Sequence, residues 1–269
     1  MKAYWKPITA VAIFSITQLL MGVILVVIGY VKGVNVSTSP TYLATSIILS
    51  GIVTIALLFA LRMVKLKTFD PRRTRWNLAP MAIIGALMGI FAMDLIGEQL
   101  NLQDYMKEEF QLLANNLWGI LAIVVVGPLV EELVFREAII VSLMHHRVHR
   151  KRAILISAIA FGLIHANPAQ IPFALIAGII LGTIFVRTRS IVLPLIIHFI
   201  NNGIAVIEIR LLGQDIEEFK LSDILGGTMA AWCYIIICST MCIIFLRQFW
   251  KKHHRKHIKK HRRHIQYSV

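Results

Sequence analysis

Two adjacent carboxylates lie in the middle of an apolar run of this 269-residue sequence. Glu131 and Glu132 are followed by Arg136, residues 117–130 before them carry no charge, and the apolar pattern resumes at Ala138. An ionised carboxylate in hydrocarbon costs on the order of several kcal/mol, so it is rarely tolerated there without a partner or a task. The spacing therefore predicts a functional site inside a membrane.

Histidines supply the second group of candidates. Of the ten histidines, three lie in residues 145–152 and five near the C-terminus, so only His165 and His198 fall within apolar blocks. At a rise of about 1.5 Å per residue, His198 lies roughly 12 Å from the end of its block, and His165 and Glu131 roughly 18 Å from the ends of theirs. Side chains of this kind, placed at similar depth, could form a proton relay or a site that activates water.

Local spacing indicates which side chains share a helix face. Glu132 and Arg136 are four residues apart, with the glutamate on the favourable N-terminal side, so we expect them to pair. That pair leaves Glu131, about 100° further round the helix, free to point elsewhere. His198 and Asn202 are also four apart and are expected to share a face.

These candidates require helices long enough to cross a bilayer, which takes roughly 20 apolar residues each. The composition, 57% hydrophobic and 16% charged, excludes an ordinary soluble domain. We predict an all-α fold, a polytopic bundle of about eight spans. The expected spans are Ile8–Val31, Tyr42–Leu61, Leu78–Ile96, Leu117–Leu143, Ala153–Ala166, Ile171–Val186, Ile191–Ile209 and Gly226–Leu246.

The charges of the connecting segments predict the orientation of the bundle. With eight spans, the basic segments 62–76, 145–152, 187–190 and the tail share one side, and the acidic segments 98–116 and 214–223 share the other. Basic loops stay in the cytoplasm, so both termini are predicted to be cytoplasmic. The formal net charge of +14 follows from this distribution, and we expect no nucleic-acid partner.

The sequence shows no internal repeat and no low-complexity linker, so residues 1–269 are expected to form a single membrane domain. Residues 247–269 form a basic cytoplasmic tail, which we expect to lie against anionic lipid headgroups. The five histidines of the tail leave a metal-binding alternative open for this segment.

The candidate residues together carry a resemblance to a known family. They form three motifs in order along the chain, Glu131-Glu132-x-x-x-Arg136, Phe161-x-x-x-His165 and His198-x-x-x-Asn202. This set resembles that of the CPBP intramembrane proteases, which include the CAAX prenyl endopeptidases and the bacteriocin-processing and Abi proteins. The resemblance covers about residues 117–209, which we take as the catalytic core. The remaining spans match the family only as generic membrane helices.

The resemblance implies an endopeptidase that hydrolyses a peptide bond within the membrane. Carried over to this sequence, Glu131 is the expected general base and holds the attacking water together with His165. His198 and Asn202 are expected to stabilise the oxyanion of the tetrahedral intermediate. The expected substrate is a peptide precursor, which could be prenylated, or a membrane protein. The expected location is the plasma (inner) membrane if the source is bacterial.

The family resemblance gives two further expectations. Glu132 and Arg136 would fix the helix that carries the first motif. A metalloprotease is also compatible with the sequence, because Glu131, His165 and His198 offer a carboxylate and two imidazoles, a set that can hold Zn or another divalent metal with an open position. The sequence contains no His-Glu-x-x-His motif, so a metal and a metal-free water activation both stay open.

Two other classes of function are compatible with the same residues. An ion-coupled transporter also places Glu, His and Arg within the membrane, although its inverted repeats or broken helices in matching halves are not visible here. A non-catalytic immunity or scaffold protein of the same family would keep the fold without the activity.

Overall fold

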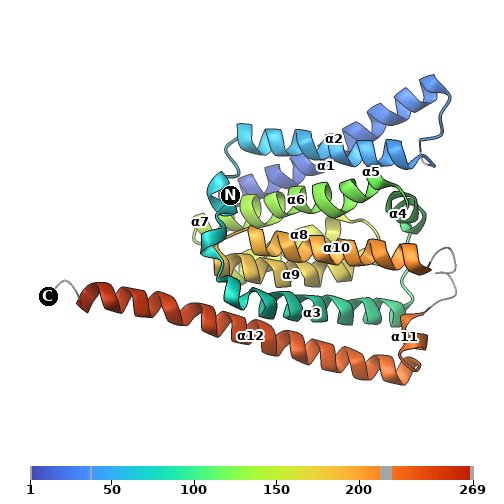
Figure 1. The fold of residues 1–269 in the computed structure, drawn as a ribbon. Coiled ribbons are helices and arrows are strands. Elements are labelled where there is room, and N and C mark those ends of the chain that lie inside the picture. The colour runs from blue at the N-terminus through green and yellow to red at the C-terminus, as the bar shows by residue number, and fades with distance from the viewer. Residues whose placement is uncertain (1, 37, 213–219, 267–269) are drawn as a thin grey trace.

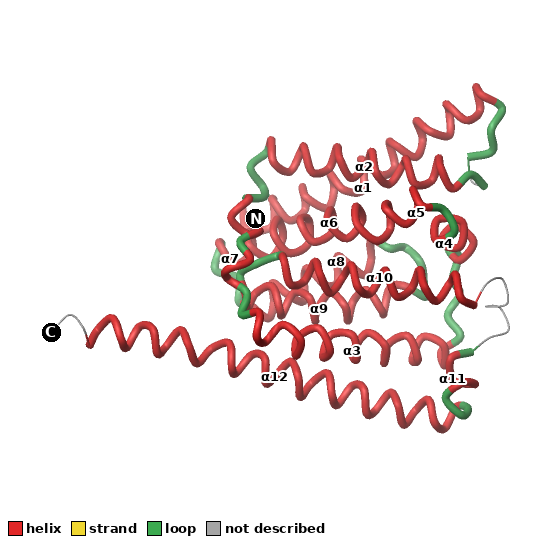
Figure 2. The backbone as a smooth tube through the Cα atoms, viewed as in Figure 1, coloured by secondary structure: helices red, strands yellow, loops and turns green. Residues whose placement is uncertain are grey.

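The computed structural model of the chain describes residues 2–36, 38–212 and 220–266. Within these ranges every regular element is a helix, and Figure 2 shows helices joined by loops. The predicted all-α bundle is therefore confirmed. Part of the predicted acidic segment 214–223 lies outside the described residues, as do the last three residues of the tail.

The described residues form eight long helical segments. They run back and forth through the bundle, alternating in direction (Figure 1). The fourth consists of five consecutive pieces, α5, η4, α6, η5 and α7, and we call the whole Leu117–His145 the motif helix. The other seven are α1 (Lys2–Lys32), α2 (Pro40–Ala60), α3 (Ala79–Leu100), α8 (Arg150–Ile164), α9 (Gln170–Thr188), α10 (Val192–Leu212) and α12 (Thr228–Gln266).

Short helices complete the connections. Three 3-10 turns, η1 (Leu66–Phe69), η2 (Pro71–Arg73) and η3 (Trp76–Leu78), join α2 to α3. At the opposite end of the bundle, α4 (Lys107–Ala114) precedes the motif helix and α11 (Leu221–Ile224) precedes α12.

Seven of the eight segments are long and apolar enough to cross a membrane. The exception is α8, the predicted fifth span, whose 15 residues reach only about 22 Å along a bilayer core of about 30 Å. The predicted polytopic bundle of about eight spans therefore agrees with the structure, with α8 as a short fifth segment. α8 is short because of the Asn167-Pro168 dipeptide, since proline disfavours helix for itself and for the residue before it.

Both ends of the described chain lie at the same end of the bundle (Figure 1). The loops 62–76, 145–152 and 187–190 lie there too, and we call this the basic end of the molecule. The arrangement agrees with the predicted sidedness of the loops. α12 continues beyond Leu246, where the last span was expected to end, and extends as one helix past the bundle to Gln266.

The helices pack in pairs, and their buried apolar side chains form three clusters. α2 packs along α1, α9 along α8, and α12 along α3. At the α8–α9 contact, a Cβ added to Gly178 would lie 3.0 Å from the Cα of Ala158, so a larger residue would separate the two backbones. On the outside, α1 and α12 expose many large apolar side chains, as expected of helices that contact lipid.

Candidate active site

The motif helix is irregular on both sides of its charged residues. Its pieces η4 (Leu121–Val126) and η5 (Leu133–Val141) are π-helical, and α6 (Gly127–Glu132) lies between them. π-helical turns often mark functional sites. The Gly127-Pro128 dipeptide lies where the first π-helical piece meets α6.

Proline explains an important contact of the first π-helical piece, η4. The N–H of Gly127 bonds five residues back, to the carbonyl of Ala122. In the same pattern Pro128 would bond to the carbonyl of Ile123, but proline has no N–H. The side chain of Asn202 supplies the missing donor, because its Nδ2 lies 2.8 Å from the oxygen of Ile123. Asn202 therefore ties α10 to the motif helix.

Glu132 forms the buried centre of the site. Its Oε2 lies 3.1 Å from Nε of Arg136, and neither side chain is exposed to solvent. Its other oxygen, Oε1, lies 3.1 Å from Nδ1 of His198 on α10. The predicted pair of Glu132 and Arg136 is therefore present, and the same carboxylate also holds a histidine that lies 66 residues away in sequence.

Glu131 lies on the other side of the same histidine. Its Oε2 is 3.4 Å from Nε2 of His198, and its side chain is 19% exposed, the largest exposed fraction among these four residues. The imidazole therefore lies between two carboxylates, one neutralised by Arg136 and one open to solvent. Glu131 is the carboxylate that a water molecule can reach.

The ring of Phe161 on α8 connects the remaining groups. The guanidinium carbon of Arg136 lies 4.7 Å from the centre of this ring, a cation-π distance. The rings of His165 and His198 contact it edge-on, with centroid distances of 4.9 and 6.0 Å. The Nη atoms of Arg136 have no hydrogen-bond partner among the described residues, so the ring face is the contact that compensates their burial.

His165 terminates α8, and its ring is oriented by its own helix. Nδ1 lies 2.7 Å from the carbonyl oxygen of Phe161. A carbonyl can only accept, so Nδ1 carries the proton and Nε2 of the neutral ring is an acceptor. Within the described chain, His165 reaches His198 through Phe161 rather than by direct contact.

A polar connection holds the loop that follows His165. Asn167 is buried; its Nδ2 donates to Oδ1 of Asp104 at 2.7 Å, and its Oδ1 accepts from the N–H of Tyr105 at 3.2 Å. This connection allows the left-handed backbone of Ala166, with φ of 50°. Sequence reasoning did not find it, because Asp104 lies in a polar segment with no motif.

The six predicted site residues are thus placed as follows. Glu131, Glu132, Arg136 and His198 form one contiguous cluster, His165 adjoins it through a shared ring, and Asn202 binds the backbone of the motif helix. The neighbouring Asn201 donates through Nδ2 to Oδ1 of Asn202 at 3.1 Å. The catalytic roles of all six stay predictions.

The fit of a metal can be judged from the arrangement of donors. In the part of the chain that the structure describes, no group of three or more His, Cys, Asp or Glu side chains is close enough to hold a metal ion. Both nitrogens of His198 face carboxylates, and His165 contacts the ring of Phe161 that lies against His198. The arrangement as it stands does not form the predicted Glu131, His165 and His198 ligand set.

Comparisons with known proteins identify the same region. Residues 113–204 match the family model described as type II CAAX prenyl endopeptidase Rce1-like. The chain is 26% identical over 231 residues to the "Membrane-embedded CAAX protease MroQ" of Staphylococcus aureus, covering 77% of this chain and 90% of that protein. It is 31% identical over 83 residues to the "Putative membrane peptidase YdiL" of Bacillus subtilis, covering 31% and 34% respectively. No solved structure matches.

The matched region contains all six predicted site residues. Together with the seven apolar helices, the matches show an integral, multi-pass membrane protein. They confirm the resemblance predicted from the three motifs: over residues 113–204 the chain is similar to the Rce1-like CAAX prenyl endopeptidases, and over a longer stretch it is similar to a membrane-embedded CAAX protease.

Proposed function

We propose that the chain is a membrane-embedded endopeptidase that hydrolyses a peptide bond with water activated at Glu131. The observation that carries the proposal is the position of His198 between a neutralised carboxylate and an accessible one, 3.1 Å from Glu132 and 3.4 Å from Glu131. A structural ion-pair network has no need of the second carboxylate, since Glu132 and Arg136 already balance each other.

Hydrogen-bond chemistry constrains the protons of the cluster. An ionised Glu132 can only accept, so Nδ1 of His198 is its donor. With a second proton on Nε2, the charges of Glu131, Glu132, Arg136 and His198 sum to zero, which is the balance that a buried site requires. The Nε2–H group is then available to a neighbouring anion.

The proposed reaction moves one negative charge across the site. Glu131 takes a proton from water as the water oxygen attacks the peptide carbonyl carbon, and the charge passes from Glu131 to the carbonyl oxygen. The Nε2–H of His198, released from its anionic partner, donates to this oxyanion. When the C–N bond breaks, Glu131 returns its proton to the leaving nitrogen. In this proposal, Nε2 of His165 accepts the second hydrogen of the attacking water.

The arrangement also refines the expected role of Asn202. One N–H of its side-chain amide is used by the carbonyl of Ile123, and its oxygen accepts from Asn201. We therefore propose that Asn202 mainly fixes α10, and with it His198, against the motif helix. The second N–H of the amide is the one that can reach an oxyanion.

The proposed substrate is a membrane-associated peptide. A direct test incubates the purified full chain in lipid nanodiscs with a peptide library containing each sequence in prenylated and unmodified form. Mass spectrometry would identify new termini, and water labelled with ¹⁸O would label the new carboxyl group of a hydrolysed product. We expect labelled products with the wild type and none with Glu131→Gln.

The matched control is Glu208→Gln, the same change on an exposed carboxylate of α10. It should cleave like the wild type. Equal cleavage by Glu131→Gln and the wild type would contradict the proposed base. No cleavage of any peptide by a folded wild type would favour the non-catalytic scaffold or the transporter instead.

A further inference from the structure

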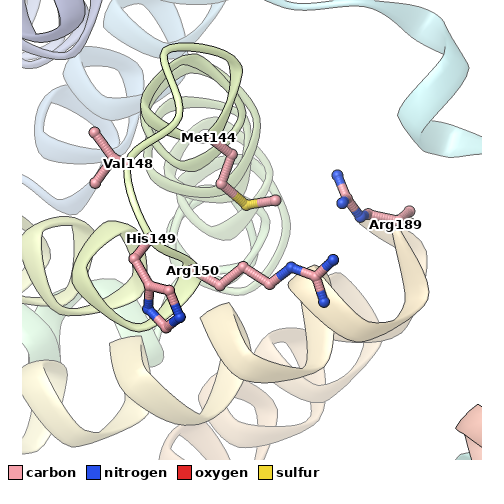
Figure 3. A pocket seen from close by; sticks show the side chains of 5 residues that line it. All are labelled: Met144, Val148, His149, Arg150 and Arg189. Carbon is pink, nitrogen blue, oxygen red and sulfur yellow. The ribbon is translucent and has the colours of Figure 1, made fainter.

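A cavity lies at the basic end of the molecule, between the turn that joins α7 (Ser142–His145) to α8 and Arg189, the C-cap residue of α9 (Figure 3). Its volume is about 410 Å³. The lining residues are Met144, Val148, His149, Arg150 and Arg189. None of them belongs to the candidate active site.

The cavity carries charge of one sign. Figure 3 shows the guanidinium groups of Arg150 and Arg189 reaching toward the same space from two different segments. Burial, followed by the charges of Arg150 and Arg73, lowers the pKa of Arg189, so the neighbouring charges that act on it are cationic. Among the described residues, no carboxylate lies within ion-pair distance of Arg150 or Arg189.

The acidic residue of the adjacent loop is already used. Asp70 accepts from Nε of Arg72 at 2.9 Å and lies 3.8 Å from Nε of Arg73. Arg73 in turn donates through Nη1 to the backbone carbonyl of Arg189 at 3.1 Å. These contacts position Arg189 and leave its side chain without a protein counter-charge.

The backbone adds to the positive potential. α8 begins at this cavity with three basic residues in succession, Arg150, Lys151 and Arg152, and its first turn contains no acidic residue. The N-terminus of a helix carries a partial positive charge, so basic residues are unfavourable there unless an anion is present. His149, the N-cap, accepts from the N–H of Lys151, which fixes the turn at the edge of the cavity.

The other wall of the cavity is apolar, formed by Met144 and Val148. A cavity with a cationic side, an apolar side and a position at the basic end of a membrane bundle suits a charged headgroup attached to a chain. We propose that this cavity binds a phosphate group, held between the guanidinium groups of Arg150 and Arg189. The proposal does not depend on the proposed peptidase activity.

The test compares two sources of phosphate on the purified full chain in a neutral detergent. Thermal unfolding is followed while dihexanoyl-phosphatidylglycerol, inorganic phosphate or zwitterionic dihexanoyl-phosphatidylcholine is titrated. We expect phosphatidylglycerol to raise the unfolding temperature saturably and phosphatidylcholine to leave it unchanged. Saturation by phosphatidylglycerol alone identifies a lipid headgroup as the ligand, and equal saturation by inorganic phosphate identifies a free phosphate.

The variant Arg150→Gln with Arg189→Gln should raise the half-saturating concentration at least about tenfold, because guanidinium-phosphate contacts are strong charge-assisted bonds. The matched control, Lys151→Gln with Arg152→Gln, removes the same number of positive charges next to Arg150, from residues that do not line the cavity. It should stay within about twofold of the wild type by the same scale.

An equal rise of the half-saturating concentration in both double variants would contradict the proposed site. It would indicate instead that the basic end attracts anions without a defined binding site. An unchanged titration in Arg150→Gln with Arg189→Gln would overturn it as well. If that double variant does not fold, the single variants Arg150→Gln and Arg150→Lys give the same comparison, since Arg150 is exposed and Lys keeps the charge. Loss of binding in Arg150→Gln with partial retention in Arg150→Lys supports the guanidinium contact.

Discussion

The two charged clusters of this molecule differ in the source of their counter-charges. The active-site cluster of Glu131, Glu132, Arg136 and His198 contains both signs, and its charges are paired within the protein. The basic cavity around Arg150 and Arg189 contains one sign and leaves both side chains exposed. Deep in a bilayer the counter-charge must come from the protein, whereas at the interface it can come from lipid or solution.

The two clusters also differ in how much stability is expected to be lost when one charged partner is removed. Removing one partner of a buried ion pair strands the other in a medium that cannot solvate it, at about 3–5 kcal/mol. Removing one partner of an exposed pair typically changes stability by about 0–1 kcal/mol. The stability of the protein is thus expected to fall when either partner of the buried Glu132 and Arg136 pair is replaced, and to tolerate most single substitutions at the basic end.

The largest effect is expected for Glu131→Gln on the rate of cleavage. The substitution keeps the shape and removes the base, so the rate should fall by at least about 10³-fold, near the upper range for general-base catalysis. Thermal stability should change little, since Glu131 is partly exposed and Glu132 keeps Arg136. Rates and unfolding temperatures measured side by side check both statements. A parallel loss of stability would show that Glu131 is structural.

The next largest effect is expected for Arg136→Ala on stability. It leaves Glu132 without its cation and should lower the free energy of unfolding by about 3–5 kcal/mol. The exposed Arg72→Ala, which breaks the surface pair with Asp70, should cost far less, because solvent screens that pair. Denaturant titrations in detergent compare the two. Similar costs for both variants would remove the distinction between the clusters.

A double variant sharpens this prediction. Arg136→Met combined with Glu132→Gln removes both charges and keeps the side-chain volumes, so it should recover much of the lost stability. It should not recover activity, because His198 loses the carboxylate that holds its Nδ1. Recovery of full activity would show that Glu132 does not position His198.

A smaller effect is expected for Asn202→Ala. The carbonyl of Ile123 loses its donor and no backbone N–H can replace it, so stability should fall by about 1–3 kcal/mol. Asn201→Ala removes a contact to Asn202 only and should cost less. Comparing unfolding free energies of the two variants tests the order. A larger loss in Asn201→Ala would contradict the role assigned to the Ile123 contact.

The smallest effect is expected from chelation. The active-site cluster balances its charge without a metal, and treatment with a chelator should change the cleavage rate by less than about twofold, well under the loss from removing a base.

His198→Ala should lower the rate by about 100- to 1000-fold as an oxyanion donor, with metal content unchanged. Reversible inactivation by chelation, with metal lost in His198→Ala, would establish the metal mechanism instead.

Much of this arrangement could be predicted from the sequence. The apolar blocks predicted the helical bundle, and the charges of the loops predicted that both termini lie at the same end of it. These two predictions depend on composition over many residues. The spacing of four residues between Glu132 and Arg136 gave their pair. The similar depth of His198 and Glu131 correctly predicted that they lie close together, because helices that cross one bilayer place residues of equal depth at the same level.

Other features depend on side-chain directions that periodicity does not contain. The position of His198 between two carboxylates, and the ring of Phe161 between two histidines, follow from packing of α8 and α10 on the motif helix. The π-helical turns were not predicted as such, although Gly127-Pro128 signalled an irregular backbone. The continuation of α12 to Gln266 was not predicted, because the polar second half of this helix shows no periodic pattern of apolar residues.

The pairing of Glu132 with Arg136 inside one helix has a consequence for biosynthesis. While the protein is made, the motif helix must enter the bilayer before α10 has left the ribosome, because His198 lies 66 residues downstream of Glu132. A carboxylate whose cation is four residues away can enter as a neutral pair, without waiting for another helix. Glu131, at 19% exposure, then gains its histidine only when α10 arrives, so completion of the active site is a late step of assembly.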